Sequence, residues 1–163
     1  MTQVNRKVRR LGAGAFIPTI VALALGVGWT AREVALASEK ADLLKSATIP
    51  VGQVSMADFQ YDGKHVGKVG AYLSGDTPGS TKFVTGRFVL DAGQTPHKPH
   101  THLEEEVMIV ESGTGEIFCD GKTTKVGPGS VMYSTPNASH GIVNTGKDPI
   151  VFYFIKWAGK KAE

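Results

Sequence analysis

From Ile49 onward, the chain consists of short apolar or alternating runs separated by breaks rich in glycine and proline. Alternation with a period of two is the pattern of a strand, whereas an amphipathic helix repeats about every 3.6 residues. No helical pattern follows residue 47, and short strands at regular spacing are typical of an all-β sandwich or barrel. Strands are therefore predicted at residues 66–73, 81–90, 106–111, 115–119, 123–126, 130–133, 141–143 and 150–157.

Two shorter features refine this pattern. Asp120-Gly121 separates two alternating runs and predicts a tight hairpin, because both central residues of a type I′ turn need positive φ. Residues 31–47 have a helix-forming composition with loosely spaced apolar positions, which indicates a short helix or a linker.

The first part of the chain has a different pattern. Residues 1–10 contain four basic residues and no acidic one, and residues 11–29 then carry no charge. A basic head before an apolar stretch predicts a signal peptide or a membrane anchor. The length of the stretch favours a hydrophobic anchor helix, while Ala35-Leu36-Ala37 has the small-x-small form of a cleavage site.

This arrangement predicts export. By the positive-inside rule the basic end stays in the cytoplasm and residues 38–163 lie outside, in a periplasmic or other extracytoplasmic space. We expect residues 1–37 to be a signal peptide or membrane anchor plus linker, and residues 38–163 to be one folded domain.

Charge follows the same division. The net charge is +3, but residues 1–37 hold five of the 18 basic residues and only one acid, Glu33. The remaining 13 basic and 14 acidic residues give the folded part no excess of positive charge. Nucleic acid is therefore not an expected partner.

The single cysteine, Cys119, excludes an intramolecular disulfide. It alternates with large apolar residues on a predicted strand, so we expect a small buried hydrophobic side chain there.

Histidine and glutamate residues cluster between residues 97 and 106. His100 and His102 are two residues apart and Glu106 keeps the same parity, so an extended chain directs all three to one face. His140 follows 34 residues after Glu106, and a barrel could return it to the same centre. Imidazoles together with a carboxylate suit Fe, Mn, Ni or Zn.

The spacing of these residues resembles that of a known family. In the stretch 93–113, His100, His102, Glu106 and Gly113 fall at the spacing of the first motif of the cupins, HxHx3Ex6G. The stretch 129–144 resembles the second motif, with Gly129, His140 and Asn144 in register. The sequence departs from the motifs at three places. Gly93 is one residue farther from His100 than usual. Thr135 stands where the second motif has proline, with Pro136 one position later, and Asn137 stands where it has glycine.

The resemblance implies a single jelly-roll β-barrel within residues 38–163. It also implies one divalent metal ion, of undetermined identity among Fe, Mn, Ni and Zn, held by His100, His102, Glu106 and His140. Pairing of two copies as a homodimer is a further expectation from the same resemblance.

Other residues are candidates for the surroundings of the metal. His97 lies three residues before His100, with the wrong parity to share its face on a regular strand. It is interpreted as an outer partner, a substrate contact, an alternative ligand or an exposed turn residue. Tyr133 and Asn144 are candidate polar contacts to a ligand. Alternation predicts an inward-facing apolar set: Phe88, Met108, Val110, Met132, Ile142, Phe152 and Phe154.

Two functions are compatible with these observations. The first is a metal-dependent enzyme acting on an oxygen-rich small molecule, of dioxygenase, isomerase or lyase type. The alternative is a non-catalytic cupin that binds a small ligand or a carbohydrate. The same scaffold hosts many chemistries, so the motif alone does not choose between them.

Overall fold

The computed structural model describes residues 43–50 and 52–160, and within these ranges it contains nine strands and no helix. The strands are β1 (Ala57–Tyr61), β2 (Lys64–Gly75), β3 (Ser80–Leu90), β4 (Glu105–Ser112), β5 (Gly115–Cys119), β6 (Lys122–Val126), β7 (Val131–Ser134), β8 (His140–Val143) and β9 (Ile150–Gly159).

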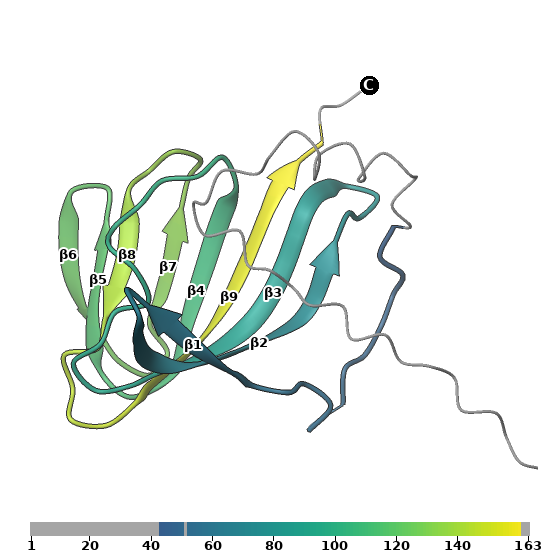
Figure 1. The fold of residues 1–163 in the computed structure, drawn as a ribbon. Coiled ribbons are helices and arrows are strands. Elements are labelled where there is room, and N and C mark those ends of the chain that lie inside the picture. Colours follow the sequence, from purple (N-terminus) through teal and green to yellow (C-terminus); the bar gives the residue numbers. More distant parts are fainter. Residues whose placement is uncertain (1–42, 51, 161–163) are drawn as a thin grey trace, which may run out of the picture.

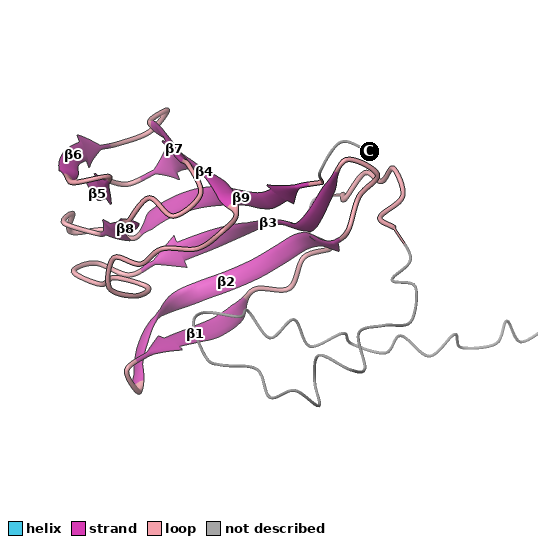
Figure 2. Ribbon diagram, turned by 90° about the horizontal axis from the view of Figure 1, so that it is seen from above, coloured by secondary structure: helices cyan, strands magenta, loops and turns pink. Residues whose placement is uncertain are grey.

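The strands form two antiparallel sheets, in the manner of a jelly roll. The larger sheet has six strands in the order β1-β2-β3-β9-β4-β7, and the smaller has three in the order β6-β5-β8 (Figure 1). Seen from above, the large sheet curves from β7 round to β1 (Figure 2). The prediction of an all-β fold is confirmed.

The predicted anchor or signal helix lies outside the described residues, as does most of the helix or linker predicted at 31–47. Residues 43–50 form neither helix nor strand. Within the described ranges, no helix has the length and apolarity needed to cross a membrane.

Each of the eight predicted strands has a counterpart among β2 to β9, but β1 was missed. Its residues are mostly exposed or half-buried, so they show little apolar alternation. The signal that could have found it is the turn Asp62-Gly63, where both residues have positive φ (51° and 70°) and Tyr61 pairs with Lys64. The predicted hairpin at Asp120-Gly121 has the same form, with φ of 47° and 81°.

One apolar core joins the inner faces of both sheets. All seven residues predicted to face inward are buried, and they come from β3, β4, β7, β8 and β9. Cys119 is partly buried and packs against this core.

Glycine makes room for one of these side chains. A Cβ atom on Gly86 would lie 2.5 Å from Cζ of Phe154, so only glycine lets that ring cross the neighbouring strand β3. Phe154 therefore lies over β3 and lines the cavity described below.

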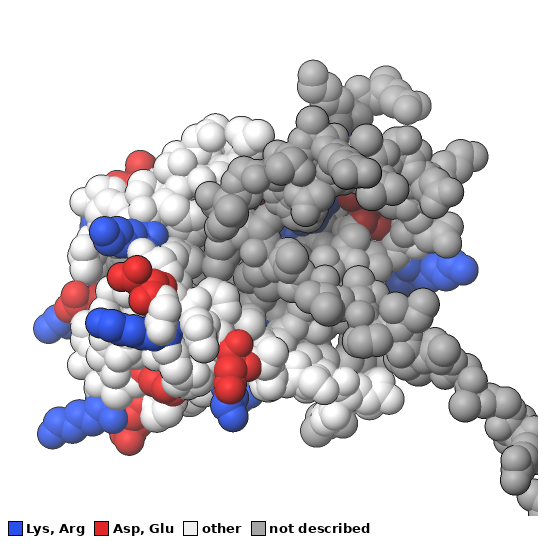
Figure 3. All heavy atoms as spheres, viewed as in Figure 1, with Lys and Arg blue, Asp and Glu red and all other residues white. Residues whose placement is uncertain are grey.

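The outer surface carries mixed charge. On the described part of the face shown in Figure 3, lysine and arginine side chains are interspersed with aspartate and glutamate.

Candidate metal centre

The four residues of the predicted ligand set meet between the two sheets. His140 opens β8 of the small sheet, and its backbone pairs with that of His100 through two N–H···O bonds of 3.0 Å. His102 lies in the loop before β4, and Glu106 is on β4 of the large sheet. One ring nitrogen from each of the three histidines lies within 4.8 Å of the others.

Glu106 completes the group. Its Oε2 lies 2.9 Å from Nε2 of His102 and 3.3 Å from Nε2 of His140. The route to this arrangement differs from the one expected, because residues 101–104 are loop and not regular strand, and β4 begins only at Glu105. The side chains converge nevertheless, since the backbone bridge to His140 fixes the loop at His100.

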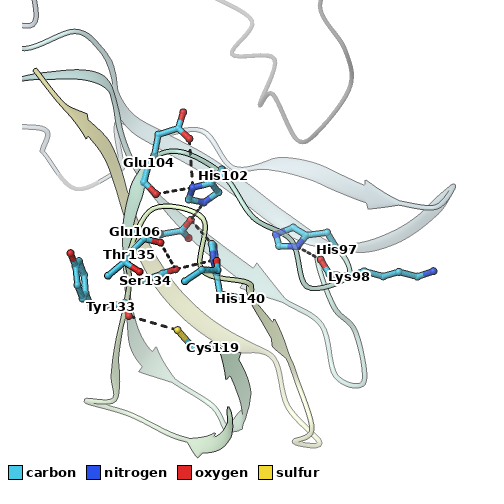
Figure 4. A network of polar contacts seen from close by, with 11 residues as sticks. His97, Lys98, His102, Glu104, Glu106, Cys119, Tyr133, Ser134, Thr135 and His140 are labelled. Carbon is cyan, nitrogen blue, oxygen red and sulfur yellow. Dashed lines mark hydrogen bonds and ion pairs between the residues drawn. The ribbon is translucent and has the colours of Figure 1, made fainter. Parts of the chain in front are cut away.

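The far side of the His102 ring is held by Glu104. Nδ1 of His102 lies 2.9 Å from the carbonyl oxygen of Glu104 and 3.5 Å from its Oε2 (Figure 4). Oε1 of Glu104 in turn pairs with Nζ of Lys82 at 3.3 Å. Glu104 is only 9% exposed, so this buried carboxylate is matched by the lysine and the imidazole.

The His140 ring is held in the same manner by the end of β7 and the turn that follows it. Its Nδ1 lies 2.9 Å from the carbonyl oxygen of Ala138 and 3.0 Å from Oγ of Ser134. Hydrogen bonds of this kind fix the orientation and tautomer of histidines that ligate metals.

These contacts show that the site suits a cation. A carbonyl oxygen only accepts, so Nδ1 of both His102 and His140 carries the hydrogen that is donated to it. Each Nε2 then faces Glu106 Oε2 with a lone pair, unless it is protonated. Two acceptors at these distances repel each other unless a proton or a metal ion lies between them.

His100 gives a second indication of fit. Its Nδ1 is buried and has no hydrogen-bond partner among the described residues. A buried nitrogen without a partner is costly, and bound water or a bound ion is the usual explanation. Three imidazoles with one carboxylate form a donor set that fits Fe, Mn, Ni or Zn.

Without metal, the charges of the group are strongly coupled. Burial alone would raise the pKa of Glu106, but hydrogen bonds from His102 and His140 outweigh it and lower this pKa to about 2. Burial likewise disfavours the charged form of His140, yet the bond to Glu106 and the Ala138 carbonyl raise the pKa of His140. Burial, followed by the neighbouring histidines, lowers the pKa of His100 to about 4.

His97 lies next to the ligand group without joining it. Its ring packs edge-on against the ring of His100, with centroids 4.0 Å apart, and its Nδ1 lies 2.9 Å from the Lys98 carbonyl oxygen. Burial lowers the pKa of His97. It lines the cavity described below, the position expected of an outer partner or a substrate contact.

The structure does not bring Tyr133 or Asn144 to the site. Tyr133 is 52% exposed on the outside of the large sheet, where its hydroxyl donates to Glu105 Oε2 at 2.6 Å. Its parity on β7 is opposite to that of the buried Met132. Asn144 is fully buried, and its amide donates to the carbonyl oxygens of Leu90 and Asp148, so it holds a loop together.

A cavity opens beside the metal ligands. Three of the four predicted ligands line it: His100, Glu106 and His140. Its walls are mainly apolar, with the side chains of Phe59, Phe88, Met108, Ile142, Phe152 and Phe154. Its remaining polar groups are His97 and Lys156.

The sequence interpretation missed the roles of Glu104, Ser134 and Lys156. Glu104 contacts His102 from a loop, for which the sequence carries no clear signal. Ser134 contacts His140 from the last position of β7 and shares the inward parity of Met132, so alternation could have found it. Lys156 could have been found, because it continues the inward alternation of Phe152 and Phe154 along β9.

The sequence around this site matches that of a known protein family. Residues 86–156 match the sequence model of the Cupin domain family, and this range contains all four predicted ligand residues. The chain therefore contains a cupin domain. No curated protein sequence matches it.

Solved cupin structures share the fold. An RmlC-like cupin from Shewanella frigidimarina superposes with a TM-score of 0.55 at 16% identity, over 71% of this chain and 95% of that one. A predicted oxalate decarboxylase from Thermotoga maritima gives 0.56 at 20% identity, over 69% and 99%. A cupin protein from Bacteroides fragilis gives 0.50 at 21% identity, over 74% and 91%.

The departure of this cupin from the second motif has a structural explanation. Asn137, which stands where the motif has glycine, adopts a φ of 64°, a left-handed conformation that asparagine tolerates better than most residues. Its N–H donates to the carbonyl oxygen of His102 at 2.7 Å. The turn that leads to His140 thereby contacts the loop that carries His102.

Proposed function

We propose that this cupin is a metal-dependent enzyme that acts on an oxygen-rich small molecule by dioxygenase, isomerase or lyase chemistry. The observation that carries the proposal is the convergence of His100, His102, Glu106 and His140 at the edge of an open, mainly apolar cavity. An enzyme site needs an accessible position beside its metal, and the cavity provides one.

Each residue has a defined task in this proposal. His102 and His140 present Nε2 to the ion because Glu104 and Ala138 hold the opposite ring nitrogen. Glu106 supplies the anionic oxygen. A divalent ion bound there would act as a Lewis acid toward an oxygen atom of the substrate.

The metal content of the full-length chain, purified without chelator, tests the proposal. We expect near-stoichiometric metal in the wild type and its loss in His100→Ala and His140→Ala. His65→Ala is the matched control, because His65 is half-exposed on the surface beside Asp91 and should leave the metal content unchanged. A wild-type protein that binds none of Fe, Mn, Ni or Zn after reconstitution would contradict the proposal.

A second measurement distinguishes the enzyme from the alternative, a cupin that binds a ligand without catalysis. The metal-loaded protein is incubated with candidate organic acids and sugars, and the compounds are followed by NMR. Unchanged compounds that nevertheless bind would favour the alternative. The activities described for the solved neighbours do not choose the reaction, because at these identities the likeness concerns the fold.

We propose further that the domain acts outside the cytoplasm. The basic residues 1–10 and the uncharged stretch 11–29 support export. Protease accessibility of the domain in intact spheroplasts tests the location, and complete protection would contradict it.

We also propose that two copies pair as a homodimer. Ile109, Val131 and Tyr133 are 37%, 64% and 52% exposed on the outer face of the large sheet, and a partner could cover them. Light scattering tests the pairing, and a monomeric mass at all concentrations would contradict it.

A further inference from the structure

Lys156 is the one lysine or arginine among the described residues that line the cavity beside the metal ligands. It is on β9, where its cross-strand partners are Val84 of β3 and Glu106 of β4. Directly opposed residues in a sheet project from the same face, with Cβ atoms about 5 Å apart. Lys156 therefore shares the inner face with the carboxylate of the metal site.

The positive charge of Lys156 has no carboxylate partner in an ion pair within residues 43–50 and 52–160. The ion pairs of lysine and arginine in those ranges join Lys82 to Glu104 and Arg87 to Glu111, and Glu106 is engaged by His102 and His140. A lysine that is half-buried in a cavity wall normally finds an anionic partner or stays fully hydrated.

The other polar groups of the cavity are contiguous with Lys156. Glu106 lies beside it across the sheet, His140 lies 3.3 Å from Glu106, and the rings of His100 and His97 follow. The rest of the lining is apolar, with the parallel rings of Phe88 and Phe152 stacked at a centroid distance of 5.5 Å. The cavity thus has one charged end and one hydrocarbon end.

The charge balance of that polar end favours an anion. A bound divalent ion and Lys156 together outweigh the single negative charge of Glu106. A sugar would need hydrogen-bond partners distributed around its ring, and the apolar walls do not offer them. A carboxylate with an apolar body satisfies both ends.

We propose that the cavity binds a small organic acid with an apolar body, its carboxylate against Lys156 and its hydrocarbon part among the phenylalanines. This inference rests on the proposed function and narrows its substrate class, because the oxygen atoms of the substrate are then those of its carboxylate at the polar end of the cavity. Lys156 is then a specificity-determining residue of the site.

Calorimetric titration of the full-length chain tests the proposal with three probes. Benzoate carries both features, benzyl alcohol keeps the ring without the charge, and acetate keeps the charge without the ring. The protein is loaded with Zn²⁺, which has no redox chemistry, and is also measured free of metal. We expect benzoate to bind at least about 10-fold more tightly than either of the other probes, through ring burial and a charge-assisted bond.

Variants identify the residue responsible. Lys156→Met keeps the length of the side chain without its charge. It should weaken the binding of benzoate by about 10-fold or more and leave the affinity for benzyl alcohol unchanged. Lys156→Arg should retain most of the affinity for benzoate. Lys125→Met, an exposed position on β6, is the matched control and should change nothing.

The outcomes are separable from those of the proposed function. The inference would be overturned, even if the metal site is confirmed, by either of two results. One is an equal loss of affinity for benzoate and benzyl alcohol in Lys156→Met, and the other is acetate binding as tightly as benzoate. A Lys156-dependent preference for benzoate in the metal-free protein would support it even if no metal binds. Thermal unfolding checks that Lys156→Met is folded, and if it is not, the wild-type preference among the probes decides.

Discussion

The two faces of the six-stranded sheet carry charged residues of different kinds, although the same strands supply both. On the inner face, Glu106 and Lys156 lie among phenylalanines at the metal ligands. On the outer face, Arg87 pairs with Glu111 at 2.9 Å, and Glu105 accepts a bond from Tyr133. Neighbouring residues such as Glu105 and Glu106 therefore have unlike surroundings.

This difference teaches where charge has a function. An ionised group in an apolar cavity loses the stabilisation of bulk water, so it persists only when it is paired, bound to a metal or matched by a ligand. On the outer face, water solvates both members of a pair and the pairing changes stability little. Substitutions at adjacent positions of one strand can test this contrast.

The largest expected effect concerns β7. Met132 is 6% exposed in the core, whereas its neighbour Val131 is 64% exposed on the outer face. Met132→Ala should lower the free energy of unfolding by about 2–5 kcal/mol through lost burial and a cavity. Val131→Ala should change it by no more than about 0.5 kcal/mol. Urea denaturation measures both, and equal losses would contradict the assignment of the two faces.

The next effect compares the adjacent glutamates of β4. Glu106→Gln removes the anionic oxygen that faces His102 and His140, and should weaken metal binding by more than about 100-fold, beyond the typical cost of losing an outer partner. Glu105→Gln, at the outward position, is the matched control. Competition with a metal indicator measures both affinities, and similar values for the two variants would exclude Glu106 as a ligand.

A smaller effect is expected from acid on the metal-free protein. The pKa of His100 is lowered to about 4 from 6.5, first by burial and then by its neighbouring histidines. The unfolded chain therefore takes up this proton before the folded one does, and stability falls as pH drops from 6.5 toward about 4.

Denaturation of the wild type and of His100→Asn in the presence of chelator measures this effect. The stability of the wild type relative to the variant should decline across that window. A constant difference would mean that His100 titrates alike in both states.

The smallest effect is expected at the outer pair of Arg87 and Glu111. Its side chains are 29% and 42% exposed, so Arg87→Met should cost no more than about 1 kcal/mol and should not alter metal binding. Chemical denaturation and metal titration check this, and a larger loss in either would show that the outer face contributes more than solvated pairs do.

The sequence by itself predicted the fold class, eight of the nine strands of the described residues and the candidate ligand set. Alternation predicted which residues of β3, β4, β7, β8 and β9 face the core, because period two maps directly onto the faces of a sheet. The motif spacing selected His100, His102, Glu106 and His140, and the structure brings them together. The edge strand β1 was not predicted, because its side chains are largely solvated and show little apolar alternation, although Asp62-Gly63 marked its turn.

Only the tertiary structure decided what surrounds those ligands. Glu104 reaches His102 through the loop before β4, and Ser134 at the end of β7 reaches His140 across the turn that joins the two sheets. Tyr133 was a candidate polar contact to a ligand, but its parity on β7 places it on the outer face of the large sheet. The register of β9 against β4 places Lys156 directly opposite Glu106, which the sequence alone did not indicate. Spacing along a chain specifies faces, whereas distances across a cavity depend on how separate strands pack.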